Sequence, residues 1–437
     1  MNKIGIRHED KYKLERRTPL IPEDVKELIQ KRGISVAVEP SKKRIFNDSE
    51  FKNSGAEIAG NLSGCDVILG VKEMPEIFFE PGKAYVFFSH VIKGQPYNMA
   101  MLKNLISAGS TLIDYEKIED DRGRRLIFFG RYAGLAGMIN TLWTVGQRYQ
   151  KLGTDNPFSK LKQAYRYSSL ESAKSEIIGI AEEIKKNGLP DEMKPLIIAV
   201  TGDGNVSQGA LDILQLLDGT SITPQQLKNN DFSAGSSVIA VNILPQDYLT
   251  HKEGHGFDLF HYIENPGMYE STIEELLPQI NVFVNGIYWD DRYPKLIKKS
   301  WLMEQAKSDQ LNLKVIGDIT CDVHGSVECT ETATDIEDPV FIYNPLDGQH
   351  QMGFNGEGVA VMAVDILPSE LPRESSEHFS AALKPFIKPL ANADFSADFD
   401  ELNLPDELKR AVIVHRGELT ENFKYLKEFL RTSVKKK

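Results

Sequence analysis

A glycine-rich loop, Gly202–Ala210, is the feature that most constrains the fold of this chain. It follows an apolar run, Pro195–Val200, typical of a buried strand, and precedes an apolar helix pattern, Leu211–Leu217. In such a unit one glycine makes the tight turn, a second lets the backbone approach a pyrophosphate, and the helix N-terminus donates amide hydrogens. A turn that merely needs glycines is the alternative. We predict dinucleotide binding through Gly202, Gly204, Asn205, Val206 and Ser207, although Ser207 stands where the fingerprint has Gly or Ala.

The choice between NAD and NADP depends on the residue that meets the adenosine ribose. A carboxylate about 20 residues beyond the loop, at the end of the second strand, is typical of NAD. Here the segment Thr220–Pro224 carries no carboxylate, and Lys228 follows it. We therefore expect NADP, with NAD as the alternative, and count Thr223 among the cofactor-binding residues.

Composition narrows the class of protein. The formal net charge is −12, and because phosphate binding needs clustered cations, nucleic acid is not expected as a partner. No stretch approaches the roughly 20 apolar residues of a membrane helix, and the charged segment Met1–Lys13 predicts no secretory signal. The 3 cysteines in 437 residues argue against a disulfide scaffold. We expect a cytoplasmic α/β enzyme with no membrane partner.

Strand and helix patterns alternate along both halves of the chain. In the first third, a helix from Pro22 to Gly33 separates the first two strand patterns. Alternation at this spacing indicates parallel pairing with crossover helices. The predicted strands are Ile4–Arg7, Ile34–Val38, Asp66–Val71, Ala84–Phe88, Ser110–Ile113, Pro195–Val200, Ser237–Val241, Val282–Val284 and Lys314–Gly317. Between the two lobes, Ala133–Tyr149 predicts a connecting helix. The fold class is two Rossmann-like, doubly wound parallel sheets with a cleft between them.

Polar residues follow several predicted strands. In open parallel sheets, ligands bind at the carboxyl ends of the strands. Each such residue alone is compatible with a surface charge, but their joint occurrence at successive strand ends favours a site. The selected residues are Glu15, Arg16, Arg17, Lys72, Glu73, His90, Lys93, Asp114, Glu116, Arg124 and Arg125 in the first lobe, and Asn285, Tyr288, Asp318 and Asp322 in the second.

These residue types suit hydride transfer to an imine. A base must take a proton from the attacking amine, and an acid must assist the loss of water. Lys72 and His90 could share these roles if burial and mutual repulsion lower the pKa of Lys72. The arginines could clamp substrate carboxylates through two parallel hydrogen bonds.

Two other site types are not expected. Three histidines, His251, His255 and His261, surround a glycine-rich loop, but no set of Cys or carboxylate residues completes a metal site, so we predict none. The Gly-x-Ser-x-Gly elbow of many hydrolases is absent.

Several short motifs together resemble the lysine-forming saccharopine dehydrogenases, in particular the lysine–ketoglutarate reductase half of the aminoadipic semialdehyde synthases of animals and plants. The resemblance extends from about Ile4 to Leu390. The motifs are Lys72–Glu76, Phe88–His90, Asp114–Glu116, Gly123–Arg125, Gly134–Gly137, Gly204–Ser207, Gly209–Ala210, Asn285–Tyr288, Asp365–Pro368 and Leu371–Glu374. Asp203 departs from the small or hydroxyl residue expected in the loop.

The resemblance implies a fold like that of alanine dehydrogenase and the transhydrogenase nucleotide-binding domains. The chain would leave the first lobe, build the cofactor lobe and return. Residues 1–135 and 350–437 would then form the substrate lobe, and residues 136–349 the dinucleotide-binding lobe.

The resemblance also implies an activity: NADPH-dependent condensation of L-lysine with 2-oxoglutarate to saccharopine. Lys72 and His90 would be the acid–base pair, and Asp322 would lie near the nicotinamide. The substrate-binding positions would be Glu15, Arg17, Glu73, Glu116 and Arg125. A separate glutamate-forming saccharopine dehydrogenase could act next. Two alternatives stay open: another amino-acid dehydrogenase of the alanine dehydrogenase type, or a non-catalytic nucleotide-binding sensor.

Overall fold

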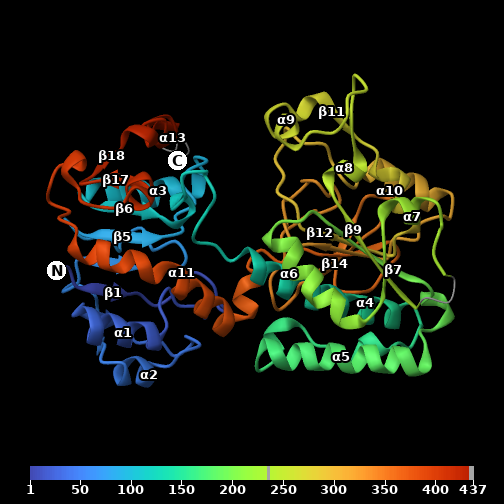
Figure 1. Cartoon of the computed structure of the whole chain (residues 1–437), viewed down its shortest axis with the longest axis horizontal. Helices are drawn as coiled ribbons and strands as arrows, with labels where there is room; N and C mark the ends of the chain where they lie inside the picture. Colours follow the sequence, from blue (N-terminus) through green and yellow to red (C-terminus); the bar gives the residue numbers. More distant parts are fainter. Residues whose placement is uncertain (234–236, 433–437) are drawn as a thin grey trace. The chain divides into compact units, whose positions relative to one another are not determined.

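The chain folds into two compact units, seen in a computed structural model that describes residues 1–233 and 237–432 (Figure 1). The first unit comprises Met1–Phe129 and Pro372–Lys437, and the second comprises Gly130–Leu371. The C-terminal segment thus returns to the first unit, as expected, but at residue 372 rather than near residue 350. The reason is that strands β14–β16, within residues 340–362, complete the second sheet.

The first unit is built on an eight-stranded sheet in the order β18-β17-β6-β5-β4-β1-β2-β3. Strands β1 to β6 are parallel, and β17 and β18 extend the sheet in antiparallel fashion beside β6. All five strands predicted in this lobe are found. The bounds are β1 (Ile4–Ile6), β2 (Val36–Val38), β3 (Glu57–Ile58), β4 (Val67–Leu69), β5 (Ala84–Phe87), β6 (Thr111–Asp114), β17 (Val412–His415) and β18 (Glu418–Leu419).

Helix α11 (Pro372–Asn392) fastens the returning segment to the first unit (Figure 1). Its apolar positions recur at helical spacing, and Phe379, Leu383, Ile387 and Leu390 are buried in the core of this unit. Helix α1 (Pro22–Arg32) ends at Gly33 as predicted. The other helices of this unit are α2 (Asp48–Asn53), α3 (Pro96–Ser107), α12 (Asp406–Arg410) and α13 (Leu426–Thr432).

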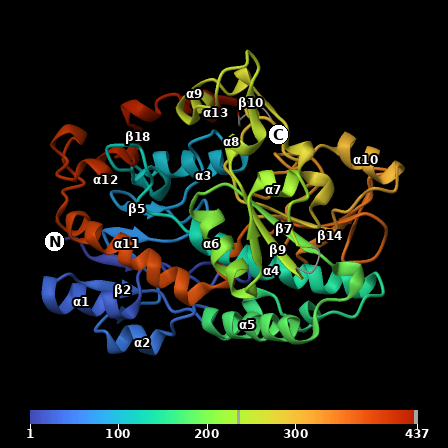
Figure 2. The ribbon, with the colours of Figure 1, turned by 45° about the vertical axis from the view of Figure 1, so that its right-hand side comes forward.

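The second unit is built on another eight-stranded sheet, in the order β15-β14-β16-β13-β12-β7-β9-β8. Its four predicted strands are found as β7 (Leu196–Thr201), β9 (Val238–Ile243), β12 (Val282–Asn285) and β13 (Val315–Asp318). Sequence reasoning missed β8 (Thr220–Ile222), β14 (Val340–Tyr343), β15 (His350–Met352) and β16 (Val359–Met362). Strand β9 lies directly beside β7 (Figure 2). Within the described part of the chain, strand β8 pairs only with β9 and is therefore at the edge of the sheet.

Figure 1 shows the helices of the second unit. They are α4 (Gly130–Lys151), α5 (Leu170–Asn187), α6 (Asn205–Leu214), α7 (Pro224–Lys228), α8 (Pro245–Tyr248), α9 (Leu259–Glu264) and α10 (Lys299–Lys307). Helix α4 confirms that Ala133–Tyr149 is helical, but the helix belongs to the second unit rather than lying between the two lobes. Among the described residues, no helix combines the length and apolar character required to cross a membrane.

Two glycines let helices α4 and α6 touch backbone to backbone. A Cβ on Gly134 of α4 would lie 1.9 Å from the carbonyl oxygen of Val206. A Cβ on Gly209 of α6 would lie 2.1 Å from the carbonyl oxygen of Arg131. Neither backbone oxygen can move aside without disturbing its own helix. The start of α6, and the glycine loop before it, is therefore held in place by α4.

Substituting Gly209 tests this contact. We expect Gly209→Ala to lower the free energy of unfolding by about 1–3 kcal/mol, because the added methyl group overpacks a backbone contact. The matched control is Gly179→Ala in α5, where a Cβ would meet nothing within 4 Å. That change should raise the free energy of unfolding by about 0.5–1 kcal/mol. Urea unfolding measures both, and equal effects would refute the close packing.

Candidate functional site

In the first unit, predicted site residues lie at the carboxyl ends of neighbouring parallel strands. Lys72 and Glu73 follow β4, and His90 follows β5, which pairs directly with β4. The Nδ1 atom of His90 lies 2.8 Å from Oε1 of Glu73. His90 has a φ of 48°, a left-handed conformation that non-glycine residues rarely adopt. The structure therefore brings Glu73 and His90 into contact, and Glu73 directly follows Lys72 in the sequence.

Glu73 is the centre of this arrangement. Its Oε1 also accepts hydrogen bonds from Lys11 Nζ at 2.7 Å and from Asn98 Nδ2 at 3.3 Å. Burial alone would raise the pKa of Glu73, but His90 and Lys11 hold it well below its ordinary value. An ionised carboxylate only accepts hydrogen bonds, so the Nδ1 atom of His90 carries a proton and Nε2 is left for proton exchange. Among the described residues, the buried Oε2 of Glu73 has no hydrogen-bond partner.

Glu15 and Arg17 form a buried ion pair after β1. Arg17 Nε and Nη2 donate to the two carboxylate oxygens of Glu15 at 2.8 and 2.5 Å, and the guanidinium lies 4.2 Å from the ring centre of Phe129. Burial opposes ionisation of Glu15, but Arg17, and secondarily Lys72, lower its pKa. The two-pronged clamp expected of Arg17 for a substrate carboxylate is thus already occupied by Glu15. Both residues nevertheless lie at the predicted edge of the sheet.

Glu116 and Arg125 are also brought together. Their closest atoms, Oε1 and Nη2, are 3.1 Å apart, and about half of the Arg125 side chain is exposed. Beside them, Asp114 at the end of β6 is fully buried and accepts hydrogen bonds from the amides of Ser89 and Glu116. Burial, with a smaller contribution from Glu116, raises the pKa of Asp114 to about 6. A second buried carboxyl thus lies beside the loop that carries His90.

Glu9 is a buried residue of this edge that sequence reasoning missed. Its carboxylate oxygens accept hydrogen bonds from the amides of Val71 at 2.7 Å and Lys72 at 3.0 Å. Burial and the neighbouring Glu15 raise the pKa of Glu9 to about 7. Glu9 therefore holds the backbone of the loop that carries Lys72. The available signal was its place after β1, in the same loop that supplies Glu15.

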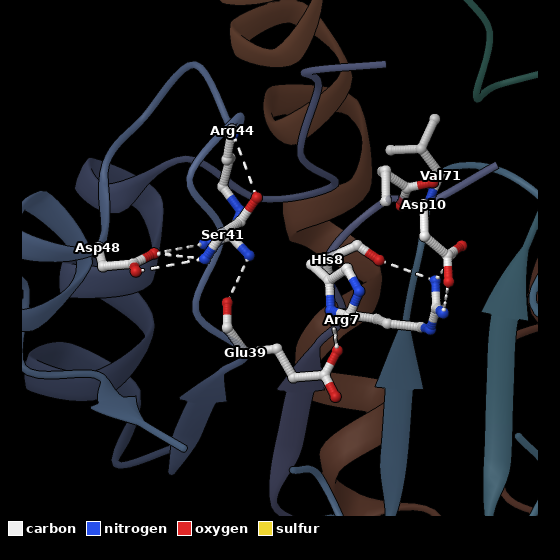
Figure 3. A network of polar contacts seen from close by, with 9 residues as sticks. Arg7, His8, Asp10, Glu39, Ser41, Arg44, Asp48 and Val71 are labelled. Atoms are coloured by element: carbon white, nitrogen blue, oxygen red, sulfur yellow. Dashed lines mark hydrogen bonds and ion pairs between the residues drawn. The ribbon is translucent and has the colours of Figure 1, made fainter. Parts of the chain in front are cut away.

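A network of polar contacts joins the residues on either side of Glu9 in the chain (Figure 3). Arg7 donates to both carboxylate oxygens of Asp10, at 3.1 and 2.5 Å, and to the carbonyl oxygen of His8 at 2.8 Å, which closes the backbone around Glu9. Glu39 accepts from the amide of His8 at 3.2 Å and lies 2.8 Å from its Nδ1. The turn from Arg7 to Asp10 is thus fixed from two sides.

The second unit carries the predicted glycine loop. Gly202 has a φ of 87°, and a Cβ there would meet Ile287 and Ser207 at 3.0 Å. Gly204 is the N-cap of α6, and a Cβ there would meet nothing within 4 Å, so the space beside it is open. Asn205 and Val206 begin α6, where amide hydrogens have no acceptor within the helix. A turn and an open approach at a helix N-terminus fit a dinucleotide pyrophosphate.

Ser207 replaces the third glycine without cost to the loop. It is fully buried, and its Oγ donates to the carbonyl oxygen of Thr201 at 2.7 Å. The helix contact that the third glycine supplies elsewhere is made here by Gly209. Asp203 is exposed.

Thr223 was selected on a strand order that the structure contradicts. It follows β8, and β9 lies between β8 and β7. Its hydroxyl caps α7 by accepting from the amide of Gln226. The strand beside β7 is β9, which ends at Ile243 and is followed by Leu244. A crossover that skips one strand is invisible in the sequence, because β8 and β9 both read simply as strands.

Asn285 and Asp322 occupy different environments. Asn285 is fully buried at the end of β12, and its Nδ2 lies within 3.0 Å of oxygens of Asp318, Thr320 and Ser326. Its side chain therefore ties strand ends together beneath the surface. Asp322 is exposed beyond the end of β13.

Comparison with known proteins shows similarity to one family in both parts of the chain. Family models for the alanine dehydrogenase/PNT N-terminal and C-terminal domains match residues 5–136 and 261–422. An alpha-aminoadipic semialdehyde synthase of Arabidopsis thaliana is 40% identical over 97% of this chain and 41% of its own length. The mitochondrial enzyme of that name from Rattus norvegicus is 32% identical over 99% of this chain and 49% of its own. The chain thus spans about half the length of these relatives or less.

A shorter relative matches over most of both chains. The lysine-forming saccharopine dehydrogenase [NAD(+)] of Neurospora crassa is 28% identical over 89% of this chain and 91% of its own. A solved L-alanine dehydrogenase covers 99% of both chains with a TM-score of 0.63 and 18% identity, a likeness of fold alone. The two domain models match most of the chain, and each of the two units contains an eight-stranded sheet. The chain belongs to the alanine dehydrogenase/PNT family.

Proposed function

We propose that this chain catalyses the reductive condensation of L-lysine with 2-oxoglutarate to saccharopine, with NADPH as the reductant. The contact between Glu73 and His90 beside Lys72 carries this proposal, together with relatives named saccharopine dehydrogenase and alpha-aminoadipic semialdehyde synthase. The sum of the reaction is lysine, 2-oxoglutarate, NADPH and one proton giving saccharopine, NADP⁺ and water. A nicotinamide nucleotide is the cofactor that the family implies, and when bound it supplies the hydride.

The residues of the first unit provide the proton transfers. The lysine amine attacks the ketone carbon, and Nε2 of His90 or the amine of Lys72 accepts the proton that the new C–N bond releases. The same groups return a proton to the carbinolamine hydroxyl, which leaves as water. The buried Oε2 of Glu73 is an acceptor suited to a substrate amine. A cavity of about 350 Å³ beside Glu73, lined also by Lys11, Tyr97 and Met101, offers space for a substrate chain.

Compartment and partner remain predictions. The animal relatives are named mitochondrial, whereas a cytoplasmic location was expected from this sequence. Further conversion of saccharopine would fall to a glutamate-forming saccharopine dehydrogenase activity, which could be a separate protein.

Oxidation of NADPH, followed by absorbance, tests the reaction. It should require both lysine and 2-oxoglutarate. Lys72→Met and His90→Gln should each lower kcat by about 10²- to 10⁴-fold, because each removes an acid–base group. Lys103→Met, an exposed change in α3, is the control and should keep full activity. Turnover with an amine or keto acid other than this pair would favour another amino-acid dehydrogenase. Cofactor binding without turnover would favour the nucleotide sensor.

Strand order gives a sharp test of cofactor choice. A carboxylate at the end of the strand beside β7 would repel a 2′-phosphate. That position is Leu244. The nearby Asp247 already accepts a hydrogen bond of 2.7 Å from the Leu244 amide through its Oδ2 atom. We expect Leu244→Asp to shift the ratio of kcat/KM for NADPH over NADH at least tenfold toward NADH. Thr223→Asp, at the end of edge strand β8, should leave the ratio unchanged. The reverse result would place the ribose beside β8.

Glu9 should act on Lys72 through the backbone. Glutamine offers one acceptor oxygen where Glu9 uses two, so Glu9→Gln loosens the Lys72 loop, and kcat should fall about 10- to 100-fold. The pH profile of kcat should also lose an ionisation near pH 7. Glu39→Gln, which alters the contact to His8 instead, should retain that ionisation. Loss of the ionisation in both variants would contradict a specific role for Glu9.

The same variant carries a stability signature. Because the pKa of Glu9 is raised from 4.5 to about 7, the folded state keeps a proton that the unfolded state releases in this range. The contribution of Glu9 to the free energy of unfolding of the wild type is therefore fully present below pH 4.5, and it declines as the pH rises toward 7. We expect the free energy of unfolding of Glu9→Gln, relative to that of the wild type, to rise as the pH increases from 4.5 to 7. Urea unfolding of both proteins across this range measures it.

A further inference from the structure

The segment between β9 and β12 contains a small hairpin apart from the large sheet. Strands β10 (Leu249–His251) and β11 (Tyr269–Ser271) form a two-stranded antiparallel sheet, with α9 between them in sequence. In Figure 1 this part lies at the top of the second unit. Two-stranded sheets are only marginally stable alone. Buried Leu249, Tyr262 and Tyr269 anchor the base of the hairpin to the core, whereas the turn after β10 is exposed.

Three metal-ligand side chains converge in that turn. His251, Glu253 and His255 each offer one ligand atom, and these atoms all lie within 4.8 Å of one another. Two of these atoms, Nε2 of His255 and Oε2 of Glu253, are 3.6 Å apart. Ligands of a tetrahedral zinc ion with bonds of about 2.1 Å lie about 3.4 Å apart. Small rotations of two exposed side chains would therefore reach a coordinating geometry.

His251 supplies the fixed member of the set. It ends β10 and is only 8% exposed, whereas the side chains of Glu253 and His255 are 64% and 71% exposed. Its Nδ1 accepts a hydrogen bond of 3.2 Å from the amide of Glu253, so a lone pair of this ring faces the turn. A cation at Nδ1 would take the place of that long hydrogen bond.

His261, from α9, is a candidate for a fourth ligand. Its ring centre lies 5.4 Å from that of His251. Its Nδ1 is 3.1 Å from the hydroxyl of Tyr269, which in turn donates to the carbonyl oxygen of Asp258 at 3.3 Å. The hydroxyl therefore accepts from Nδ1, and the lone pair of His261 is on Nε2. Hydrogen bonding of the second ring nitrogen is the usual support for a metal-binding histidine.

The ammonium group of the turn has a partner outside the ligand set. Lys252 lies between the ligands in sequence, but its ammonium donates to the carbonyl oxygen of Gly267 at 2.6 Å. Aromatic packing is the competing explanation, since the ring of His251 meets those of His255 and Tyr269 edge to face. Packing would account for the buried His251 but gives no role to the carboxylate of Glu253. That carboxylate, two residues from each histidine, is the member that sequence reasoning overlooked.

We propose that His251, Glu253 and His255 bind one zinc ion, or another divalent transition-metal ion that prefers imidazole, with His261 or water completing the shell. The ion ties the exposed turn to the strand that anchors it.

The test uses the full-length, untagged protein, stripped with a chelator and desalted. Zinc is titrated against a chromophoric competitor, and cobalt(II) is added separately because a tetrahedral site gives it intense visible absorption. Wild type should bind one equivalent of zinc and show that absorption. His255→Asn and Glu253→Gln, both exposed changes, should each weaken zinc binding at least 100-fold. His324→Asn is the matched control, because His324 also lies near a carboxylate, 3.7 Å from Glu331.

The outcomes separate a built site from surface binding. The proposal is supported if the wild type and His324→Asn bind one equivalent of zinc and His255→Asn and Glu253→Gln lose this binding. No stoichiometric binding by wild type overturns it. Binding that survives both turn variants, or that His324→Asn weakens equally, overturns it as well. Circular dichroism of each variant confirms that the fold is kept, and activity plays no part in the readout.

Discussion

Buried carboxyl groups at the carboxyl edge of the first sheet are the constraint on which this unit depends. Glu9, Glu15, Glu73 and Asp114 are all buried there, and each is held by N–H donors. A buried charge is costly unless it is paired or hydrogen-bonded, so every one of these groups dictates where its donors lie. The loops after β1, β4, β5 and β6 are fixed by this requirement, which no packing of apolar side chains could impose.

The same requirement explains the contacts around Glu73 and His90. The donors to Glu73 are His90, Lys11 and Asn98, from three different segments, so their convergence positions the imidazole and orients its proton. Glu9 then fixes the adjoining backbone amides. In the second unit, the equivalent constraint is steric: backbone contact through glycines of α4 and α6 places the helix N-terminus that a pyrophosphate would approach.

The predictable part of the fold was local. Each strand predicted from an apolar run was found, as was α1 with its terminal Gly33, because burial of an apolar run and helix termination are decided by neighbouring residues. The positions of Lys72, Glu73 and His90 at strand ends were predictable, because these residues directly follow recognisable strands. Glu9 was missed because its hydrogen-bond donors, the backbone amides of Val71 and Lys72, lie 62 and 63 residues away in the sequence.

The sequence by itself determined the alternation of strands and helices, the glycine loop, and which polar residues follow strands, since all of these depend on short stretches of chain. Only the tertiary structure decided which strands are neighbours. It set β9 beside β7, so the residue that follows the neighbouring strand is Leu244 and not Thr223, which follows the edge strand β8. It also paired Arg17 with Glu15 rather than leaving its guanidinium to a ligand. Both outcomes depend on long-range packing and burial, whose energies are settled only when distant segments meet.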